Sequence, residues 1–182
     1  CVFTNNEELA LKMKSLRVHG QSKRYHHKYI GMGGRLDTLQ AAVLNVKLKY
    51  YPKDLALRQE VASKYTEALK SNTNLVLPYV DKKATSAWAQ YSVRVKNREE
   101  LKQIFDKDQK ANLMSIQEYL KSNGIPTAVH YPMPLHLQEC FTYLGYSKGD
   151  FPISETVATE IISLPMNPYL SDEEIDYIVG NL

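Results

Sequence analysis

The apolar positions at the start of the chain follow a helical period in two stretches. The first runs from residue 7 to residue 17 and ends before Gly20, with acidic residues at its beginning, which predicts a short helix. The second begins at Leu36 and continues to about Lys70 with only Pro52 as interruption. This second stretch predicts two helices or one kinked helix.

The pattern changes after a polar turn at residues 71–74, where alternating and helical stretches follow one another. The expected elements are strands at 76–80, 87–95 and 127–131 and helices at 99–121, 136–144, 154–163 and 171–179. Ser171 and Glu174 have the spacing of a capping box at the start of the last helix. Helices and strands in this order predict a second unit and an α/β or α+β architecture.

The composition is that of a folded globular protein. The chain has 182 residues, of which 43% are hydrophobic and 24% charged, which excludes a disordered, collagen-like or disulfide-stapled protein. Cys1 and Cys140 form neither a disulfide framework nor a metal-binding pair. The apolar runs are shorter than a bilayer span needs, and the start does not resemble a signal peptide. We therefore expect a soluble cytoplasmic protein, and because no Met precedes Cys1, we expect a fragment of a longer one.

Positive charge is concentrated near the N-terminus. Residues 9–36 contain seven Lys or Arg and no acidic residue, and since the whole chain carries a net +3, the remainder carries a net −4. Such asymmetry points to an anionic partner, whether nucleic acid, a phosphorylated small molecule or an acidic protein surface. No stacking platform or helix-turn-helix pattern accompanies the basic segment, so nucleic acid is the least expected of these partners.

The glycine-rich segment 20–34 has the side chains of a binding loop. It combines four of the eight glycines with histidine and tyrosine residues, and Arg17, Arg24 and Arg35 lie in or beside it. A guanidinium group suits phosphate or carboxylate because two N–H groups meet two oxygens. The alternative is a solvated basic surface that binds nothing specific.

A second candidate is the pair His130 and Tyr131 at the end of the expected strand 127–131. Both side chains can hydrogen-bond a sugar or phosphate oxygen, and strand ends are where α/β proteins place such groups. The alternative is a packed tyrosine beside a structural histidine. No Cys, His or Asp spacing near His26 and His27 matches a zinc site, and the chain has neither a G-x-S-x-G nor a P-loop motif. A metal centre or a serine nucleophile is therefore not expected.

Several segments together resemble one known family. They are His19–Gln21, Arg24–His27, Gly31–Ala42, Gly124–Pro132 and Ser163–Pro168, and they occur in the expected order over nearly the whole chain. These segments resemble the DegT/DnrJ/EryC1/StrS family of pyridoxal-phosphate-dependent sugar aminotransferases. Within the family, the chain is most similar to enzymes that aminate UDP-2-acetamido-2-deoxy-3-oxo-glucuronate.

The resemblance implies the C-terminal portion of a pyridoxal-phosphate-dependent transferase of fold type I, which is an α/β fold. Residues 1–70 are then expected to be the end of the large cofactor-binding domain with its long connecting helix, and residues 71–182 the small C-terminal α/β domain. The family's cofactor-bearing lysine is expected before Cys1, so no lysine of this chain is assigned a catalytic role. The resemblance also implies a homodimer with shared active sites.

The resemblance assigns binding residues as well. Family members usually carry Asn at the position of Gly33, where it contacts the phosphate of the neighbouring subunit's cofactor. The contact is therefore either lost or replaced by backbone N–H groups, and in the second case Gly33 and Gly34 are the residues expected to contact pyridoxal 5'-phosphate across the dimer. The expected substrate-binding residues are Arg35, His130, Tyr131, Arg24 and His26, and no metal ligand is expected.

The activity that the resemblance implies is transfer of an amino group from glutamate to a UDP-linked keto sugar, in surface-polysaccharide or related glycan biosynthesis. The pyridoxal ring would act as the electron sink. Two alternatives stay open: a dehydratase of the same fold acting on a keto sugar, and a non-catalytic module that binds a nucleotide sugar and dimerises. The chain alone is expected to be inactive, and neither nucleic acid nor a membrane is an expected partner.

Overall fold

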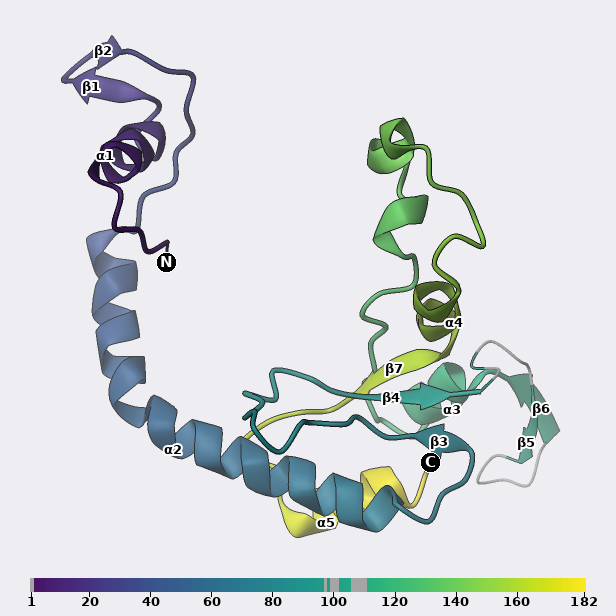
Figure 1. The fold of residues 1–182 in the computed structure, drawn as a ribbon. Helices are drawn as coiled ribbons and strands as arrows, with labels where there is room; N and C mark the ends of the chain where they lie inside the picture. The colour runs from purple at the N-terminus through teal and green to yellow at the C-terminus, as the bar shows by residue number, and fades with distance from the viewer. Residues whose placement is uncertain (1, 97, 99–101, 106–110) are drawn as a thin grey trace. The chain divides into compact units, whose positions relative to one another are not determined.

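The computed structural model describes residues 2–96, 98, 102–105 and 111–182 (Figure 1). The chain divides into two compact units, Cys1–Tyr51 and Pro52–Leu182, which are described separately. The boundary between them falls within one long helix. The assignment of residues 1–70 to a large domain and of residues 71–182 to a small one stays a prediction.

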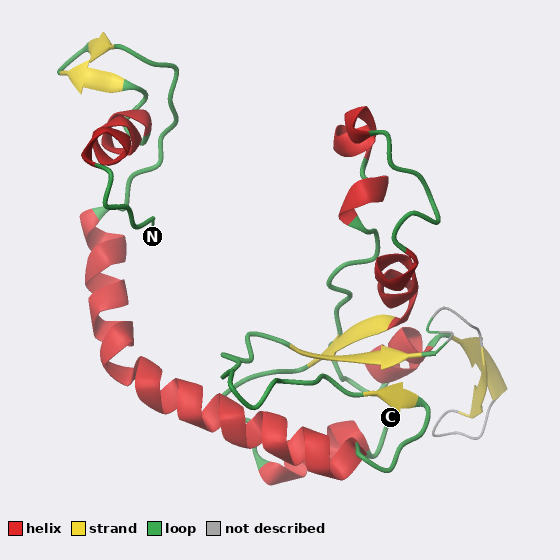
Figure 2. Cartoon of the chain, viewed as in Figure 1, coloured by secondary structure: helices red, strands yellow, loops and turns green. Residues whose placement is uncertain are grey.

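The N-terminal unit begins with helix α1, Glu7–Leu16, which confirms the helix predicted there. Asn6 is its N-cap, and the Asn6 side chain accepts a hydrogen bond from the backbone N–H of Leu9 at 2.9 Å. The following segment, expected to be a loop, contains a short antiparallel hairpin of strands β1, Gln21–Lys23, and β2, His26–His27 (Figure 2).

Helix α2, Thr38–Leu69, is a single helix that contains Pro52. Of the two arrangements that the sequence left open, the structure has one continuous helix. Its buried residues are Val61, Ala62, Tyr65 and Leu69, whereas its first half exposes Leu39, Val43, Leu44, Val46, Leu48, Tyr50 and Tyr51. No helix in the described part of the chain is both long and apolar enough to cross a bilayer.

The C-terminal unit is built on a three-stranded antiparallel sheet of order β3-β4-β7. Strand β3 is Leu75–Val76, β4 is Tyr91–Val95 and β7 is Ile161–Leu164. Tyr91 and Val93 are buried while the residues next to them on β4 are half-buried. This alternation is the period of two that a strand with one face on the core requires.

The core of this unit lies between the sheet and three helices: the second half of α2, helix α3, Ile116–Ser122, and helix α5, Asp172–Val179. Tyr65 is at its centre. The Tyr65 ring lies 5.1 Å from the Tyr91 ring, and the Tyr65 hydroxyl donates a hydrogen bond to the Pro165 carbonyl at 3.0 Å. Burial raises the pKa of Tyr65 well above its ordinary value.

The capping box predicted at the start of the last helix is confirmed. The Ser171 side chain accepts from the backbone N–H of Glu174, and the Glu174 carboxylate accepts from the Ser171 N–H at 2.9 Å. Two helix N–H groups are thereby satisfied. Helix α3 has the same arrangement between Ser115 and Glu118. The backbone N–H of Ser115, and after it the Ser115 hydroxyl, donate to the Glu118 carboxylate and lower the pKa of that group.

The helix expected at residues 99–121 is wrong in its described part. Strands β5, Lys102–Phe105, and β6, Ala111–Met114, pair antiparallel there, and only α3 is helical. Residues 99–101 and 106–110 lie outside the described residues. The helix expected at 154–163 ends earlier: helix α4 is Pro152–Glu160, and strand β7 begins at Ile161. The pairing of β7 with β4 decides its conformation.

Four further expected elements are corrected. The helix expected at 136–144 is a pair of short 3-10 helices, η1, Leu135–Leu137, and η2, Glu139–Leu144. The strand expected at 127–131 is reduced to one isolated bridge between Ala128 and Ser163. Likewise, the strands expected at 76–80 and 87–95 shrink to β3 and β4. The mixture of helices and sheet confirms the predicted α/β class, with antiparallel pairing in the described sheets.

Candidate functional site

The sequence-predicted residues fall into two groups, one in each compact unit. Gly33, Gly34, Arg35, Arg24 and His26 belong to the N-terminal unit, and His130 and Tyr131 belong to the C-terminal unit. Of these residues, His130 and Tyr131 contact each other through their rings.

Two glycines let the basic loop fold back on itself. Gly20 has a φ of +74°, and a Cβ there would lie 1.8 Å from the Tyr29 carbonyl oxygen. A Cβ at Gly31 would lie 2.3 Å from the backbone nitrogen of Gly20. The backbones therefore pack directly on each other, and the Lys28 N–H donates to the Gly20 carbonyl at 2.8 Å. This packing holds the β1–β2 hairpin beside the end of α1.

The candidate cations of this unit are exposed. The Arg24 guanidinium lies 5.1 Å from the centre of the Tyr25 ring, and one of its nitrogens lies 3.3 Å from the Tyr25 hydroxyl. His26 and Arg35 are exposed as well. Within the described residues, neither Arg24 nor Arg35 forms an ion pair, which leaves both able to meet an anion.

Arg35 lies three residues before the start of α2 at Thr38, so it belongs to the segment that leads into the helix rather than to the helix itself. The sequence pattern placed the start of the helix earlier, at Arg35 and Leu36. Because Gly34 precedes it and its own side chain is exposed, Arg35 is free to adjust to a bound carboxylate.

The backbone groups of the two candidate glycines differ. The Gly34 N–H donates to the Arg17 carbonyl at 2.8 Å. The Gly33 N–H has no acceptor within the described residues, so it is the one available to a phosphate oxygen. A Cβ at Gly33 would lie 3.4 Å from Cε1 of the His19 ring, which is close to ordinary contact. A side chain at this position is therefore tolerated. The contact of Gly33 and Gly34 with a cofactor stays a prediction.

In the C-terminal unit, His130 and Tyr131 follow the bridge between Ala128 and Ser163. The Nδ1 atom of His130 lies 2.9 Å from Oγ of Ser163, and the His130 and Tyr131 rings meet edge to face at 5.6 Å. Tyr131 is 72% exposed. One side chain is therefore anchored in the sheet, while the other is directed to solvent.

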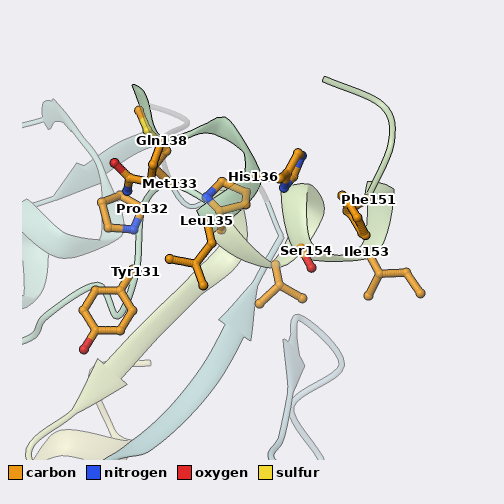
Figure 3. Close-up of a pocket in the computed structure, with 12 residues that line it drawn as sticks. Tyr131, Pro132, Met133, Leu135, His136, Gln138, Phe151, Ile153 and Ser154 are labelled. Carbon is orange, nitrogen blue, oxygen red and sulfur yellow. The ribbon is translucent and has the colours of Figure 1, made fainter. Parts of the chain in front are cut away.

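A pocket of about 720 Å³ opens next to Tyr131. Most of the residues between Tyr131 and Gln138 and several between Phe151 and Ala158 line it, with apolar and aromatic side chains predominating. Figure 3 shows Tyr131 at one end and Phe151 and Ile153 at the other. Its size and apolar lining suit a small organic ligand with one flat ring. The sequence did not predict this pocket, although Pro132 and Pro134, which follow Tyr131, form part of one wall.

One wall of the pocket is held by a half-buried polar contact. Nε2 of His136 lies 2.9 Å from Oε1 of Glu155, and the backbone N–H of Gly149 donates to the same oxygen at 2.8 Å. The Gly149 hydrogen bond, and after it the His136 hydrogen bond, lower the pKa of the Glu155 carboxyl below its ordinary value. The His136 ring also packs on Phe151 at 4.8 Å. The contact orders this wall before any ligand binds.

The described side chains offer hydrogen-bond donors, cations and an apolar pocket. In the described ranges, no three His, Cys, Asp or Glu side chains gather where they could hold a metal ion. Exposed guanidinium groups and a free backbone N–H suit phosphate and carboxylate groups, and the pocket suits a ring. The N-terminal unit can therefore recognise an anionic group, and the C-terminal unit can bind a ring.

Comparisons with known proteins point in one direction. Residues 1–182 match the sequence profile of the DegT/DnrJ/EryC1/StrS aminotransferase family. The chain is 40% identical over 100% of its length to the UDP-2-acetamido-2-deoxy-3-oxo-D-glucuronate aminotransferase of Pseudomonas aeruginosa, of which it covers 45%. It is 37% identical over 98% of its length to the dTDP-3-amino-3,6-dideoxy-alpha-D-galactopyranose transaminase of Aneurinibacillus thermoaerophilus, of which it covers 44%.

A solved structure of the same family has a similar fold. A crystal structure of a DegT DnrJ EryC1 StrS aminotransferase from Brucella abortus is 37% identical and superimposes with a TM-score of 0.77, covering 98% of this chain and 44% of the other. The chain therefore spans less than half the length of the proteins it matches. The similarity confirms an aminotransferase-type α/β fold of which this chain corresponds to one portion.

Proposed function

The chain belongs to the DegT/DnrJ/EryC1/StrS aminotransferase family, and we propose that it is part of an enzyme that transfers an amino group from glutamate to a UDP-linked keto sugar. In this reaction the sugar exchanges its ketone oxygen for an amine nitrogen, and glutamate leaves as 2-oxoglutarate. The identity of 40% to an aminotransferase whose substrate is a UDP-linked 3-oxo-glucuronate supports this choice of sugar.

The observation that carries the proposal is the pairing of His130 and Tyr131 beside the pocket. The Nδ1 atom of His130 is held by Ser163 at 2.9 Å, and the Tyr131 ring lines a pocket of about 720 Å³. A fixed imidazole and an exposed phenol next to an apolar pocket can hydrogen-bond the sugar while the pocket excludes water from part of it. This arrangement supports the proposal that the C-terminal unit contacts the sugar.

The residues of the basic loop fit the phosphate of pyridoxal 5'-phosphate. The Gly33 N–H has no acceptor within the described residues, and the surrounding segment carries only positive charge. When bound, this cofactor supplies the carrier for the amino group and the electron sink. In our proposal, Gly33 contacts the phosphate across a dimer through its N–H, and Gly34, whose own N–H is bonded to the Arg17 carbonyl, lets the backbone approach the phosphate. The lysine that carries the cofactor comes from another part of the polypeptide.

Arg35 is proposed to bind the carboxylate of the sugar acid. It is exposed and has no ion-pair partner among the described side chains. A guanidinium–carboxylate pair is bidentate, so it fixes the orientation of the sugar as well as attracting its charge. Arg24 and His26 lie in the same exposed loop and are proposed to assist at the phosphates.

We propose that the working enzyme is a homodimer. The first half of α2 exposes a run of large apolar side chains between Leu39 and Tyr51. A monomeric soluble protein rarely exposes so large an apolar patch to water. A second subunit, or another part of the same polypeptide, would cover these side chains. Light scattering on the active full-length protein distinguishes a dimer from a monomer, and a fully active monomer would contradict shared active sites.

The reaction consumes a charged nucleotide sugar and glutamate, neither of which crosses a bilayer without a carrier. We therefore place it in the cytoplasm, and its product suits the assembly of a surface polysaccharide. The support for this pathway is the sugar in the name of the P. aeruginosa relative, UDP-2-acetamido-2-deoxy-3-oxo-D-glucuronate.

The test is a comparison of two UDP-linked 3-keto sugars that differ only in having a carboxylate or a hydroxymethyl group on the ring. We expect the full-length protein to form 2-oxoglutarate from glutamate with the sugar acid, and much more slowly with the neutral sugar. Equal rates would contradict the role of Arg35. Loss of water from the sugar without use of glutamate would identify a dehydratase instead.

A further inference from the structure

Two serine hydroxyls connect His130 to the centre of the sheet. Ser92 on β4 and Ser163 on β7 are partners in the strand register, and their Oγ atoms lie 2.8 Å apart. The Ser163 Oγ in turn lies 2.9 Å from Nδ1 of His130. Ser163 is 5% exposed, and its backbone pairs with Ala128 on one side and with β4 on the other. Its hydroxyl is therefore held in place from both sides.

The count of hydroxyl protons decides which group donates and which accepts in the chain Ser92–Ser163–His130. Each hydroxyl carries one proton to donate. If Ser92 donates to Ser163 and Ser163 donates to Nδ1 of His130, both protons have an acceptor. In the opposite direction, the half-buried Ser92 would hold a proton for which the described residues offer no acceptor. Because an unsatisfied donor costs free energy, the first direction is the stable one.

We infer that Ser163 and Ser92 are positioning residues that fix neutral His130 with its proton on Nε2, so that the ring presents a hydrogen-bond donor to the nucleotide sugar. The hydrogen bond at one ring nitrogen decides which nitrogen carries the proton. Within the described part of the chain, Nε2 of His130 has no partner, which leaves this N–H for a ligand. Only the identity of that ligand rests on the proposed function.

This assignment restricts what His130 does with the sugar. A donor at Nε2 selects an acceptor oxygen, such as the keto, carboxylate or phosphate oxygens of the proposed substrate. The same nitrogen already carries a proton, so it does not take one from the sugar. His130 therefore binds and orients the substrate, and Tyr131, whose ring meets it edge to face at 5.6 Å, completes the contact surface.

The first test is nitrogen NMR of the full-length protein labelled with ¹⁵N-histidine and free of substrate, in which loss of one signal in His130→Gln identifies the residue. We expect wild-type His130 at neutral pH to show an unprotonated Nδ1 and a protonated Nε2, and Ser163→Ala to show a mixture of the two tautomers. A proton on Nδ1 in the wild-type protein would overturn the inference.

The second test measures kinetics separately for the two substrates. We expect Ser163→Ala to lower kcat/KM for the nucleotide sugar about tenfold and Ser92→Ala to lower it less, since Ser92 acts through Ser163. Neither change is expected to alter the kinetics with glutamate. Thr66→Val is the matched control: it removes a hydroxyl 2.9 Å from the Tyr91 hydroxyl in the same unit without touching His130.

The outcomes separate the inference from the proposed function. Equal losses for sugar and glutamate in Ser163→Ala, or no loss for either, would show that the serine is merely structural. If Ser163→Ala does not fold, Ser92→Ala decides, because Ser92 does not contact the ring. If the wild-type protein does not aminate the sugar at all, the proposed function fails, while the NMR result still decides the direction of the hydrogen-bond chain.

Discussion

The carboxylate of Glu155 accepts a hydrogen bond from Nε2 of His136 at 2.9 Å, and this contact joins helix α4 to the 3-10 turn η1 across one wall of the pocket. The same carboxylate oxygen accepts the backbone N–H groups of Gly149 and Phe151, at 2.8 and 3.4 Å. Three donors from two parts of the chain, η1 and the segment 149–151, thus converge on one oxygen. The wall is fixed by this convergence rather than by regular secondary structure.

Glu155→Gln should destabilise the protein at neutral pH and have less effect in acid. The pKa of Glu155 lies below its ordinary value, first because of the Gly149 N–H and then because of His136. At pH values above the ordinary pKa of a glutamate, the ionised carboxylate of Glu155 therefore stabilises the folded protein. This stabilisation is lost as the pH falls through the lowered pKa. Urea unfolding at a series of pH values measures this difference.

The control for this prediction is Glu139→Gln, at an exposed carboxylate of η2 without a side-chain hydrogen bond among the described residues. It should leave the unfolding midpoint nearly unchanged. A Glu155→Gln effect that is constant from neutral to strongly acidic pH would show that the charge of Glu155 is irrelevant to the wall.

Gly20→Ala should loosen the basic loop. The new Cβ would lie 1.8 Å from the Tyr29 carbonyl oxygen at a backbone φ of +74°, so the backbone has to move. We expect the free energy of unfolding to fall by roughly 1–3 kcal/mol. We also expect faster hydrogen exchange at the Lys28 amide, which donates to the Gly20 carbonyl. In Gly34→Ala, where the nearest atom to the new Cβ is 3.6 Å away, exchange at Lys28 should stay unchanged. Equal exchange in both variants would contradict the close packing.

Arg35→Lys should weaken use of the sugar acid by roughly tenfold or more, because lysine keeps the charge but loses the bidentate fork. The half-reaction with glutamate should stay near normal. Steady-state kinetics with each substrate varied in turn measure both effects. A loss of the same size in both half-reactions, or in neither, would show that Arg35 does not bind the sugar carboxylate.

His130→Ala should raise KM or lower kcat/KM for the nucleotide sugar and leave cofactor binding intact. The side chain is anchored on Ser163 in the C-terminal unit, whereas the proposed phosphate contact at Gly33 lies in the N-terminal unit. Cofactor content after gel filtration and kinetics with the sugar give the two readouts. Loss of the cofactor from the variant would place His130 in the cofactor site instead.

The sequence predicted those elements whose signals are local. Helix α1 has its cap and its acidic first turn in adjacent residues, and α5 has both members of its capping box three residues apart. Such signals act within one turn of chain, so they are visible without the tertiary structure. The helical pattern of apolar positions along α2 was equally visible in the sequence, although Pro52 left open whether one helix or two would form.

One error occurs where distant parts of the chain decide the conformation. Strand β7, Ile161–Leu164, follows directly on α4, and a short apolar run is equally compatible with a helix; its pairing with β4, about 70 residues earlier, makes it a strand. The hairpin of β5 and β6 was also predicted as helix, although these two strands are close together in the sequence, so distance along the chain does not explain this error.

The candidate site was predicted in part. Motif residues such as Arg35 and His130 could be named because the family resemblance marks them, and their binding roles remain predictions. The pocket and the contacts of His136 and Ser163 could not be named. They depend on side chains from segments far apart in sequence, which only folding brings together.

The most direct test of the proposed function is to incubate the full-length protein with ¹⁵N-labelled glutamate and the UDP-linked 3-keto sugar acid, and to weigh the nucleotide sugar by mass spectrometry. We expect a product in which one ¹⁵N amine has replaced the ketone oxygen, formed together with 2-oxoglutarate. A nucleotide sugar that loses water without gaining ¹⁵N, or one that stays unchanged, would contradict the proposed function.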